Sequence, residues 1–156
     1  TQKFIATSKN RSLSWEKRAE QLIDAGLKKL NLELGIISHI IGDKYTIIYS
    51  NNSELIGKEF NLGVTYCQIT MSMVSNTVVA IENFAVTEHF RHPAYKEFKL
   101  ETYIASPIIS DRKRLGTINF TMPERRLMPF SAYEKDLVYS LSKDAGIIVL
   151  EATTKV

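Results

Sequence analysis

The chain has 156 residues, of which 44% are hydrophobic and 24% charged, and its formal net charge at pH 7 is +3. This length allows one domain with a substantial core. The net charge is small and the basic residues lie in short, scattered clusters, which argues against a nucleic-acid partner. No apolar run approaches the roughly 18 residues that would suggest a membrane span. The single cysteine excludes an internal disulfide and a multi-cysteine metal site. So few cysteines are typical of cytoplasmic proteins.

The first predicted element is a helix near the N-terminus. Residues 1–11 are mixed and polar, and we expect them to be a lead-in to a single domain over residues 12–153. Ser14 is a typical N-cap, the apolar residues after it follow helical spacing as far as Leu30, and Gly35 is expected to end the helix. Because the chain starts without Met and stops at EATTKV, directly after a helical pattern, we interpret it as an excerpt of a longer signalling protein.

The next predicted elements are two strands and a short helix. The β-like runs 36–41 and 45–50 flank a Gly-Asp-Lys sequence, which predicts a hairpin. Further along, Thr65 and Gln68 have the spacing of a capping box, so that a short helix is expected over residues 67–74.

Three further strands and another short helix are predicted in the second half of the chain. A short strand is expected over 78–82. Pro93 is tolerated only in the first turn of a helix, so a second short helix is expected to begin there and to end near Lys99. Two longer strands, 101–109 and 115–122, flank a charged turn.

The strand over 115–122 alternates between polar and apolar residues. Ile118 and Phe120 point to one side of the sheet, while Asn119 and Thr121 point to the other. The apolar side suits a helix-covered core, and the polar side suits the floor of a pocket.

The last predicted element is a long helix. Ser131 and Glu134 form a capping box before it. Ile147 and Leu150 add apolar surface beside its main apolar stripe, which suits a helix from a second copy of the chain. The element order predicts an α+β fold, in which an antiparallel sheet is covered on one face by the two terminal helices.

Six longer motifs occur along the chain, in the order LGVTYCQIT, VAIENFAVTEHFRHPAY, LETYIASPI, RLGTINFT, PERRLMPFS and EKDLVYSL. Their order and spacing resemble those of a GAF domain, of the type found in bacterial sensory histidine kinases and related signalling proteins. The resemblance covers roughly residues 15–152.

The resemblance implies a GAF-like, PAS-related antiparallel sheet of five to six strands. The terminal helices would cover one face, and short helices and loops would form a pocket on the other. Such domains hold a small molecule or leave the pocket empty, and they often dimerise in parallel through terminal helices that continue into an output domain.

Carried onto this sequence, the resemblance predicts a ligand pocket lined from the first short helix, the strands and the HFRHPAY segment. The expected lining residues are Tyr66, Cys67, Thr70, Met73, Ile81, His92, Tyr95, Phe98, Tyr103, Asn119 and Thr121. Strand alternation is also consistent with the last three.

The two histidines of HFRHPAY, His89 and His92, raise the question of a metal site. Zinc requires at least three protein ligands, and these two residues with a neighbouring glutamate offer only a partial set, which Pro93 disturbs further. His39 lies on a predicted strand. We therefore expect no metal, and we expect His92 and Tyr95 to form hydrogen bonds or stack at a pocket wall, with His92 sensitive to pH near neutrality.

The single cysteine, Cys67, has two interpretations. The N-terminus of the short helix could lower the pKa of its thiol, or the residue could be a small buried hydrophobe. GAF-type methionine-sulfoxide reductases use several cysteines, and bilin-binding members attach the pigment through a later cysteine that FRHPAY lacks, so the resemblance argues against covalent bilin. For a cyclic nucleotide, only fragments of the expected motif are present, such as Asn83-Phe84.

Arg125 and Arg126 lie in a segment bounded by prolines. We expect one of them to bond backbone carbonyls or a carboxylate and so to orient the start of the last helix; the alternative is an anion contact at the pocket rim.

These observations predict a sensory domain without catalytic activity that controls a fused output domain, such as a histidine kinase or a diguanylate cyclase, in bacterial signal transduction. Its partners would be a small molecule of unknown identity and a second copy of the chain, with neither nucleic acid nor membrane. Two alternatives stay open: an unliganded dimerisation module, and a thiol-based redox sensor or enzyme that uses Cys67.

Overall fold

The first helix, α2 (Trp15–Leu30), begins where the sequence predicted it. The computed structural model describes residues 13–154, and the predicted lead-in over 1–11 lies outside these residues. Ser14 Oγ accepts a hydrogen bond of 3.1 Å from the backbone N–H of Lys17, which confirms the N-cap. The prediction that Gly35 ends this helix is wrong, because Asn31 already adopts the left-handed conformation, with a φ of 57°.

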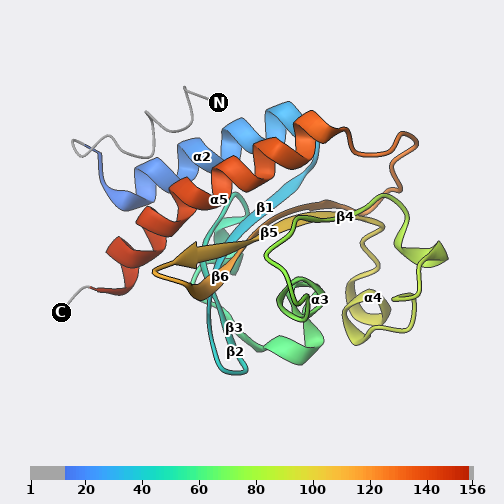
Figure 1. Ribbon diagram of the computed structural model, residues 1–156, viewed down its shortest axis with the longest axis horizontal. Coiled ribbons are helices and arrows are strands. Elements are labelled where there is room, and N and C mark those ends of the chain that lie inside the picture. The colour runs from blue at the N-terminus through green and yellow to red at the C-terminus, as the bar shows by residue number, and fades with distance from the viewer. Residues whose placement is uncertain (1–12, 155–156) are drawn as a thin grey trace.

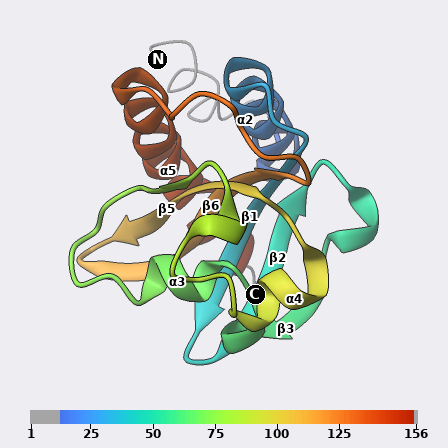
Figure 2. The same ribbon diagram turned by 90° about the vertical axis from the view of Figure 1, so that its right-hand side faces the viewer.

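Six antiparallel strands form one sheet in the order β3-β2-β1-β6-β5-β4, which Figures 1 and 2 show from two sides. Their bounds are β1 (Leu34–Ile41), β2 (Lys44–Ser50), β3 (Glu59–Asn61), β4 (Val79–Ile81), β5 (Thr102–Ser110) and β6 (Lys113–Met122). The sequence predicted all of them except β3, which has only three residues and therefore no readable alternation.

The centre of the sheet joins two strands that are far apart in the sequence. β1 and β6 pair with Ile37 opposite Ile118, and Gly116 permits their close approach near Ser38. A Cβ atom at Gly116 would lie 1.9 Å from the carbonyl oxygen of Ser38, so no larger residue fits there without moving a strand.

The two long helices cover one face of this sheet. α2 and α5 (Ala132–Thr153) lie side by side across it (Figures 1 and 2). Phe120 of β6 is fully buried beneath them, and a Cβ atom at Gly26 of α2 would lie 2.5 Å from its ring. The main core fills the space between these helices and the sheet. It includes the fully buried residues Ala19, Leu22, Ile23, Ile37, Ile104, Ile108, Ile118, Phe120, Leu137, Val138, Leu141, Ala145, Ile148 and Val149.

The start of α5 carries the predicted capping box. Ser131 Oγ accepts from the backbone N–H of Glu134, and Glu134 Oε1 accepts from the backbone N–H of Ser131. Arg126 Nη2 donates to both carboxylate oxygens of Glu134, at 2.8 and 2.6 Å, and its guanidinium lies 4.1 Å from the ring centroid of Phe130. Arg126 therefore bonds a carboxylate and orients the start of the last helix, as the first of the two interpretations predicted.

Short helices and turns occupy the opposite face of the sheet. They are α3 (Cys67–Met71), α4 (Pro93–Phe98) and 3-10 turns over Ser53–Leu55, Leu62–Val64 and Phe84–Val86. Pro93 begins α4 as predicted. The capping box expected at Thr65 and Gln68 is wrong, because the Thr65 hydroxyl donates back to the carbonyl of Leu62 at 2.8 Å and closes the preceding turn.

One arginine holds the end of α3 to the sheet. Arg114 of β6 donates hydrogen bonds of 2.8 Å to the carbonyl of Met71 and 2.7 Å to that of Met73. Its Nε also donates to Asn76 Oδ1 at 2.7 Å. The segment between α3 and β4 is thereby fixed over one end of β6.

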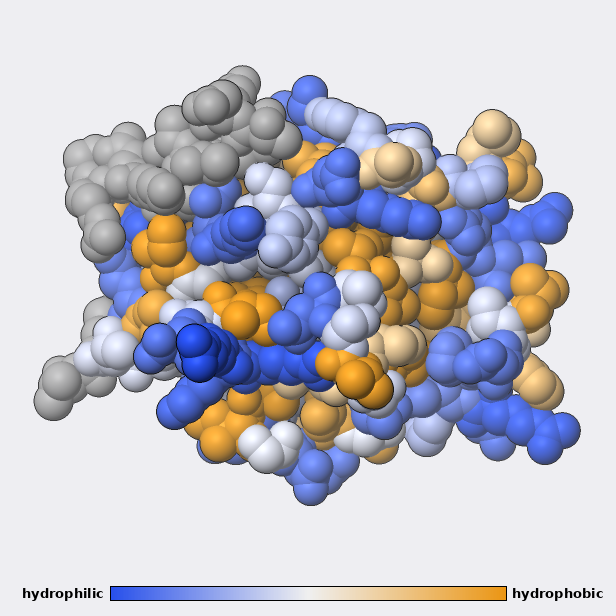
Figure 3. Space-filling view, viewed as in Figure 1, coloured by the Kyte–Doolittle hydropathy of each residue, from blue (hydrophilic) through white to orange (hydrophobic). Residues whose placement is uncertain are grey.

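Figure 3 shows the hydropathy of one face of the molecule. Charged and apolar side chains are interspersed there, and apolar side chains gather over β4 and α3. None of the helices within residues 13–154 combines the length and the apolar character that crossing a membrane would require.

Candidate functional site

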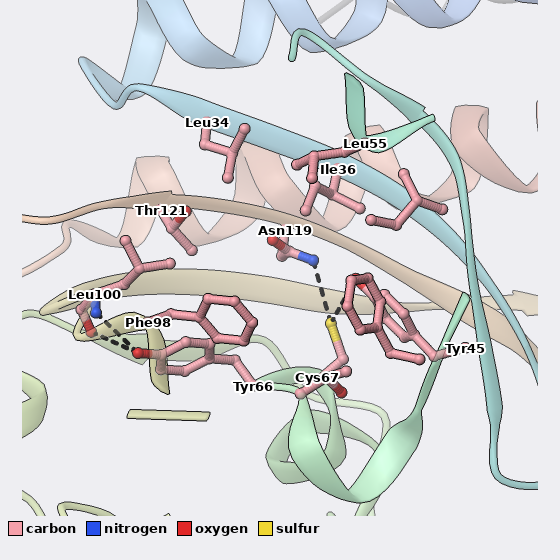
Figure 4. A pocket seen from close by; sticks show the side chains of 13 residues that line it. Leu34, Ile36, Tyr45, Leu55, Tyr66, Cys67, Phe98, Leu100, Asn119 and Thr121 are labelled. Atoms are coloured by element: carbon pink, nitrogen blue, oxygen red, sulfur yellow. Dashed lines mark hydrogen bonds between the residues drawn. The ribbon is translucent and has the colours of Figure 1, made fainter. Parts of the chain in front are cut away.

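A cavity of about 170 Å³ lies on the face of the sheet opposite the two long helices (Figure 4). It is bounded by the sheet on one side and by α3 and the end of α4 on the other. Its lining residues are Leu34, Ile36, Tyr45, Ile47, Leu55, Phe60, Thr65, Tyr66, Cys67, Phe98, Leu100, Asn119 and Thr121.

The walls of this cavity are mainly apolar. The hairpin of β1 and β2 contributes Ile36 and Ile47, and Phe98 at the end of α4 is half exposed. None of the described residues that line the cavity carries a formal charge. Such a space suits an apolar or neutral group better than an ion, because an ion would lose its hydration without gaining a counter-charge.

A polar cluster surrounds the Cys67 sulfur at one side of the cavity. Thr117 Oγ1 donates to Sγ at 2.9 Å, and Asn119 Nδ2 donates to it at 3.2 Å. The hydroxyls of Tyr45 and Tyr103 lie at 3.7 and 3.6 Å from the same sulfur. The thiol is therefore held in place by β2, β5 and β6 at once.

Burial decides the protonation state of this cysteine. Desolvation raises the pKa of Cys67, although hydrogen bonds from Thr117, Tyr103 and the other neighbours oppose the rise. The idea that the helix N-terminus lowers the pKa of the Cys67 thiol is wrong for this structure, in which the side chain is 2% exposed. Desolvation likewise raises the pKa of Tyr45 and of Tyr103 well above their ordinary value, so all three groups are neutral at physiological pH.

Two polar side chains of β6 have unused hydrogen-bonding capacity at the cavity. The Thr121 hydroxyl is buried, with 3% of the residue exposed, and has no hydrogen-bond partner among the described residues. The Asn119 amide directs its nitrogen to the sulfur of Cys67, which leaves its oxygen on the other side of the group (Figure 4). A buried hydroxyl without a partner is costly, and a ligand that bonded to it would remove that cost.

Tyr66 connects α3 to the segment that follows α4. Its hydroxyl accepts from the backbone N–H of Leu100 at 2.9 Å and donates to the carbonyl of the same residue at 3.2 Å (Figure 4). Burial raises the pKa of Tyr66 to about 12. The tyrosine thus fixes Leu100 at the cavity while its ring forms part of the lining.

Four aromatic rings fill the half of this face that lies over β4 and β5. Tyr66 stacks on Tyr103 with ring centroids 5.6 Å apart and meets the edge of Phe84 at 5.0 Å. Phe84 in turn stacks on Tyr95 at 5.1 Å. Because these rings close that half, the remaining space lies over β1, β2 and β6.

The structure brings five of the predicted pocket residues together around the cavity. They are Tyr66, Cys67, Phe98, Asn119 and Thr121. The other six lie outside its lining. Met73, Ile81, Tyr95 and Tyr103 belong to the aromatic half, Thr70 forms a 2.8 Å hydrogen bond with the Tyr103 hydroxyl, and His92 caps α4.

The sequence analysis missed the contribution of the first hairpin. Leu34 and Ile36 alternate on β1, and Tyr45 and Ile47 alternate on β2, all on the cavity face. This alternation was a readable signal, since the terminal helices could cover only one face of the sheet and the apolar residues on the other face required a second cover.

The histidines take part in protein contacts. His92 Nδ1 accepts from the backbone N–H of Ala94 at 3.0 Å, and His92 Nε2 lies 2.9 Å from Gln68 Oε1. The ring of His89 packs near Phe84, and His39 is half-buried on β1, where desolvation lowers its pKa. Among residues 13–154, no three His, Cys, Asp or Glu residues are grouped so as to hold a metal ion.

Comparison with known proteins places the chain in one fold family. The family model described as GAF domain matches residues 30–149. The GAF domain of a phosphoenolpyruvate-protein phosphotransferase from Acinetobacter is 14% identical, with a TM-score of 0.80 over 99% of this chain and 94% of that one. A search of curated proteins gave no match.

Two further solved structures share the fold with different chemistry. The phycocyanobilin-bound GAF domain of a cyanobacterial phytochrome is 14% identical, with a TM-score of 0.73 over 95% of this chain and 91% of that one. A type II free methionine-R-sulfoxide reductase from Thermoplasma acidophilum is 13% identical, with a TM-score of 0.67 over 88% and 93%. Identities this low establish the likeness of the fold alone, so the chemistry of the site has to be argued from its own residues.

Proposed function

The chain belongs to the GAF domain family, and from that premise we propose that it is a sensory domain that binds a small molecule in the cavity over β6 and thereby controls a fused output domain. GAF domains are regulatory modules that bind ligands. The output domain we propose is a histidine kinase or a diguanylate cyclase of bacterial signal transduction.

The observation that carries this proposal is the cavity itself. Protein interiors are close-packed, and an empty apolar cavity costs about 24 cal/mol per Å³ in stability. An unfilled space of about 170 Å³, lined by a residue with a buried and unpartnered hydroxyl, suits a bound molecule better than a purely structural core.

A route from the cavity to the long helices runs through a single strand. Asn119 and Thr121 of β6 face the cavity, while Phe120 between them packs under α2 and against Gly26. A ligand that binds one position of β6 more tightly than another would therefore shift how α2 and α5 sit on the sheet. The size of the shift is limited by the difference between the two affinities.

We propose that the long helices also pair with a second copy of the chain. Leu150 and Tyr139 of α5 are 40% and 45% exposed, and Ile147 is partly exposed beside them. Apolar side chains on the outer surface of a helix that already covers the sheet favour a helix–helix contact. Such a dimer would pass the movement of α5 to the output domain.

A thiol-based activity receives no support from the site. The Cys67 sulfur is buried, neutral and already engaged by four neighbours, whereas a nucleophilic cysteine needs thiolate character and access. We therefore expect this domain to bind its ligand without turning it over.

The test is native mass spectrometry of the freshly purified chain, followed by thermal unfolding in the presence of a metabolite library. We expect one small molecule per chain, either carried through purification or added. A ligand at 100 times its Kd adds about 2.7 kcal/mol, which raises the Tm of a domain of this size by roughly 5–10 °C. The proposal is wrong if no bound mass is found and no compound in the library raises the Tm.

A further inference from the structure

We infer that the cavity takes an uncharged molecule about the size of one six-membered ring that carries a single O–H or N–H group. This inference rests on the proposed function, because it names the class of ligand for the same cavity. Three observations support it: the volume of the cavity, the absence of charge in its described lining, and the position of its unused polar atoms.

The volume limits the size of the ligand. An apolar cavity of about 150 Å³ is known to hold one benzene molecule, and the cavity here has about 170 Å³. One ring with a small substituent fits this space, whereas pockets for drug-sized ligands measure roughly 300–1,000 Å³. A cyclic nucleotide or a tetrapyrrole would require the cavity to become several times larger.

The lining selects against an ionised ligand. Its ionisable members are Cys67, Tyr45 and Tyr66, all of them neutral because desolvation raises their pKa values. A carboxylate or an ammonium group would therefore be buried without a partner of opposite charge, which is strongly unfavourable. A neutral ligand meets no such penalty.

The polar atoms select for a ligand with one donor group. The Thr121 hydroxyl has no partner in the described part of the chain, and the Asn119 oxygen is turned away from the sulfur that its nitrogen bonds (Figure 4). The two residues point to the same face of β6, one pleat apart. We propose that a ligand O–H donates to Asn119 Oδ1 and accepts from the buried Thr121 hydroxyl once this hydroxyl turns toward the cavity, with Ile36, Ile47 and Tyr66 of the lining around its ring.

Isothermal titration calorimetry at pH 7 with three probes of similar size tests this inference. Phenol carries the ring and the donor, toluene lacks the donor, and benzoate carries a charge. We expect phenol to bind at least about tenfold more tightly than toluene, as one well-placed hydrogen bond allows, and benzoate to give no binding heat.

Two variants test whether phenol binds inside the cavity. Thr121→Val keeps the shape of the side chain and removes the hydroxyl, so it should weaken phenol binding about tenfold and leave toluene binding unchanged. Thr46→Val makes the same change on β2 at a residue outside the cavity lining and should leave phenol binding unaltered. Both variants must first show an unfolding transition like that of the wild type.

The outcomes separate the ligand class from the proposed function. If benzoate binds as tightly as phenol, or if Thr121→Val weakens phenol and toluene equally, the ligand class is wrong. If phenol does not bind but the library yields a larger or charged ligand, the inferred ligand class is wrong and the proposed sensory function is retained. If no molecule of any class binds, both are contradicted.

Discussion

The Nε2 atom of His92 lies 2.9 Å from the side-chain oxygen of Gln68, so that the N-cap of α4 is tied to the first turn of α3. His92 Nδ1 accepts the backbone N–H of Ala94, which requires the proton of the neutral ring to be on Nε2, from where it donates to Gln68. The neutral imidazole therefore makes both bonds, whereas the protonated ring keeps only its bond to Gln68. Protonation of Nδ1 removes the acceptor for Ala94.

The first prediction is that stability falls as the pH drops below about 7. Desolvation, with a smaller contribution from His89, lowers the pKa of His92 below its ordinary value of 6.5. Between that value and the lower folded-state pKa, the unfolded chain binds more protons than the folded chain, so the free energy of unfolding decreases with falling pH. Below the folded-state pKa, this group causes no further loss.

Urea unfolding between pH 5 and 8 measures this effect, with His92→Asn as the matched variant. Asparagine keeps a side-chain acceptor for the N–H of Ala94 and does not titrate. The pKa of His39 is also lowered by burial, so both proteins should lose stability on acidification, and the wild type should lose more. Identical pH profiles would show that His92 does not contribute.

The second prediction compares two threonines on the same face of β6. Thr121→Val removes a buried hydroxyl without a partner and should leave the free energy of unfolding unchanged or raise it by about 1 kcal/mol. Thr117→Val removes a hydroxyl that bonds Cys67 and Ser38 and should lower it by about 1–3 kcal/mol. Urea denaturation followed by circular dichroism distinguishes the two. Equal destabilisation by both variants would mean that Thr121 has a partner in the unliganded protein.

The third prediction concerns the reactivity of Cys67. Because the thiol is buried and its pKa is raised, reaction with a disulfide reagent at pH 7.5 should require local opening of the fold. An opening that costs about 3 kcal/mol slows the reaction at least ~100-fold relative to the unfolded chain. Stopped-flow absorbance measures the reaction rate without urea and in 8 M urea, the condition chosen to unfold the chain, and so gives the ratio of the two rates. Equal rates would restore the thiol-based alternative.

The fourth prediction concerns the oligomeric state. Light scattering should give about twice the 17.7 kDa mass of the chain. Leu150→Glu places a charge on the exposed side of α5 and should shift the protein to the monomer mass, whereas Val74→Glu, at a fully exposed residue of another segment, should leave it a dimer. A wild-type monomer, or a dimer that both variants leave intact, would contradict pairing through α5.

Much of the fold was predictable because local signals set the element ends. Ser14, Pro93 and Ser131 each place the start of a helix by a mechanism that involves only neighbouring residues, and each is confirmed. The two wrong expectations, at Gly35 and Thr65, have a common cause. A competing local hydrogen bond decided each case, since the backbone N–H of Asn31 donates to the carbonyl of Leu27 and the Thr65 hydroxyl donates to that of Leu62.

The cavity was less predictable because distant residues determine its position. The alternation along β6 correctly indicated that Asn119 and Thr121 face away from the helices. No periodicity, however, indicated that Tyr66, Phe84 and Tyr103 would stack together and fill one half of that face. Once they do, the open space lies under the first hairpin rather than beside the HFRHPAY segment.

The proposed function requires that a small molecule binds inside the cavity over β6. Calorimetric titration of three proteins with the molecule that stabilises the wild type tests it most directly. Ile36→Trp fills the cavity from β1, and Ile41→Trp makes the same change at the exposed end of the same strand. Circular dichroism first establishes that both variants are folded. We expect Ile36→Trp to bind at least about tenfold more weakly and Ile41→Trp to bind like the wild type, whereas unchanged binding by folded Ile36→Trp would place the ligand elsewhere and contradict the claim.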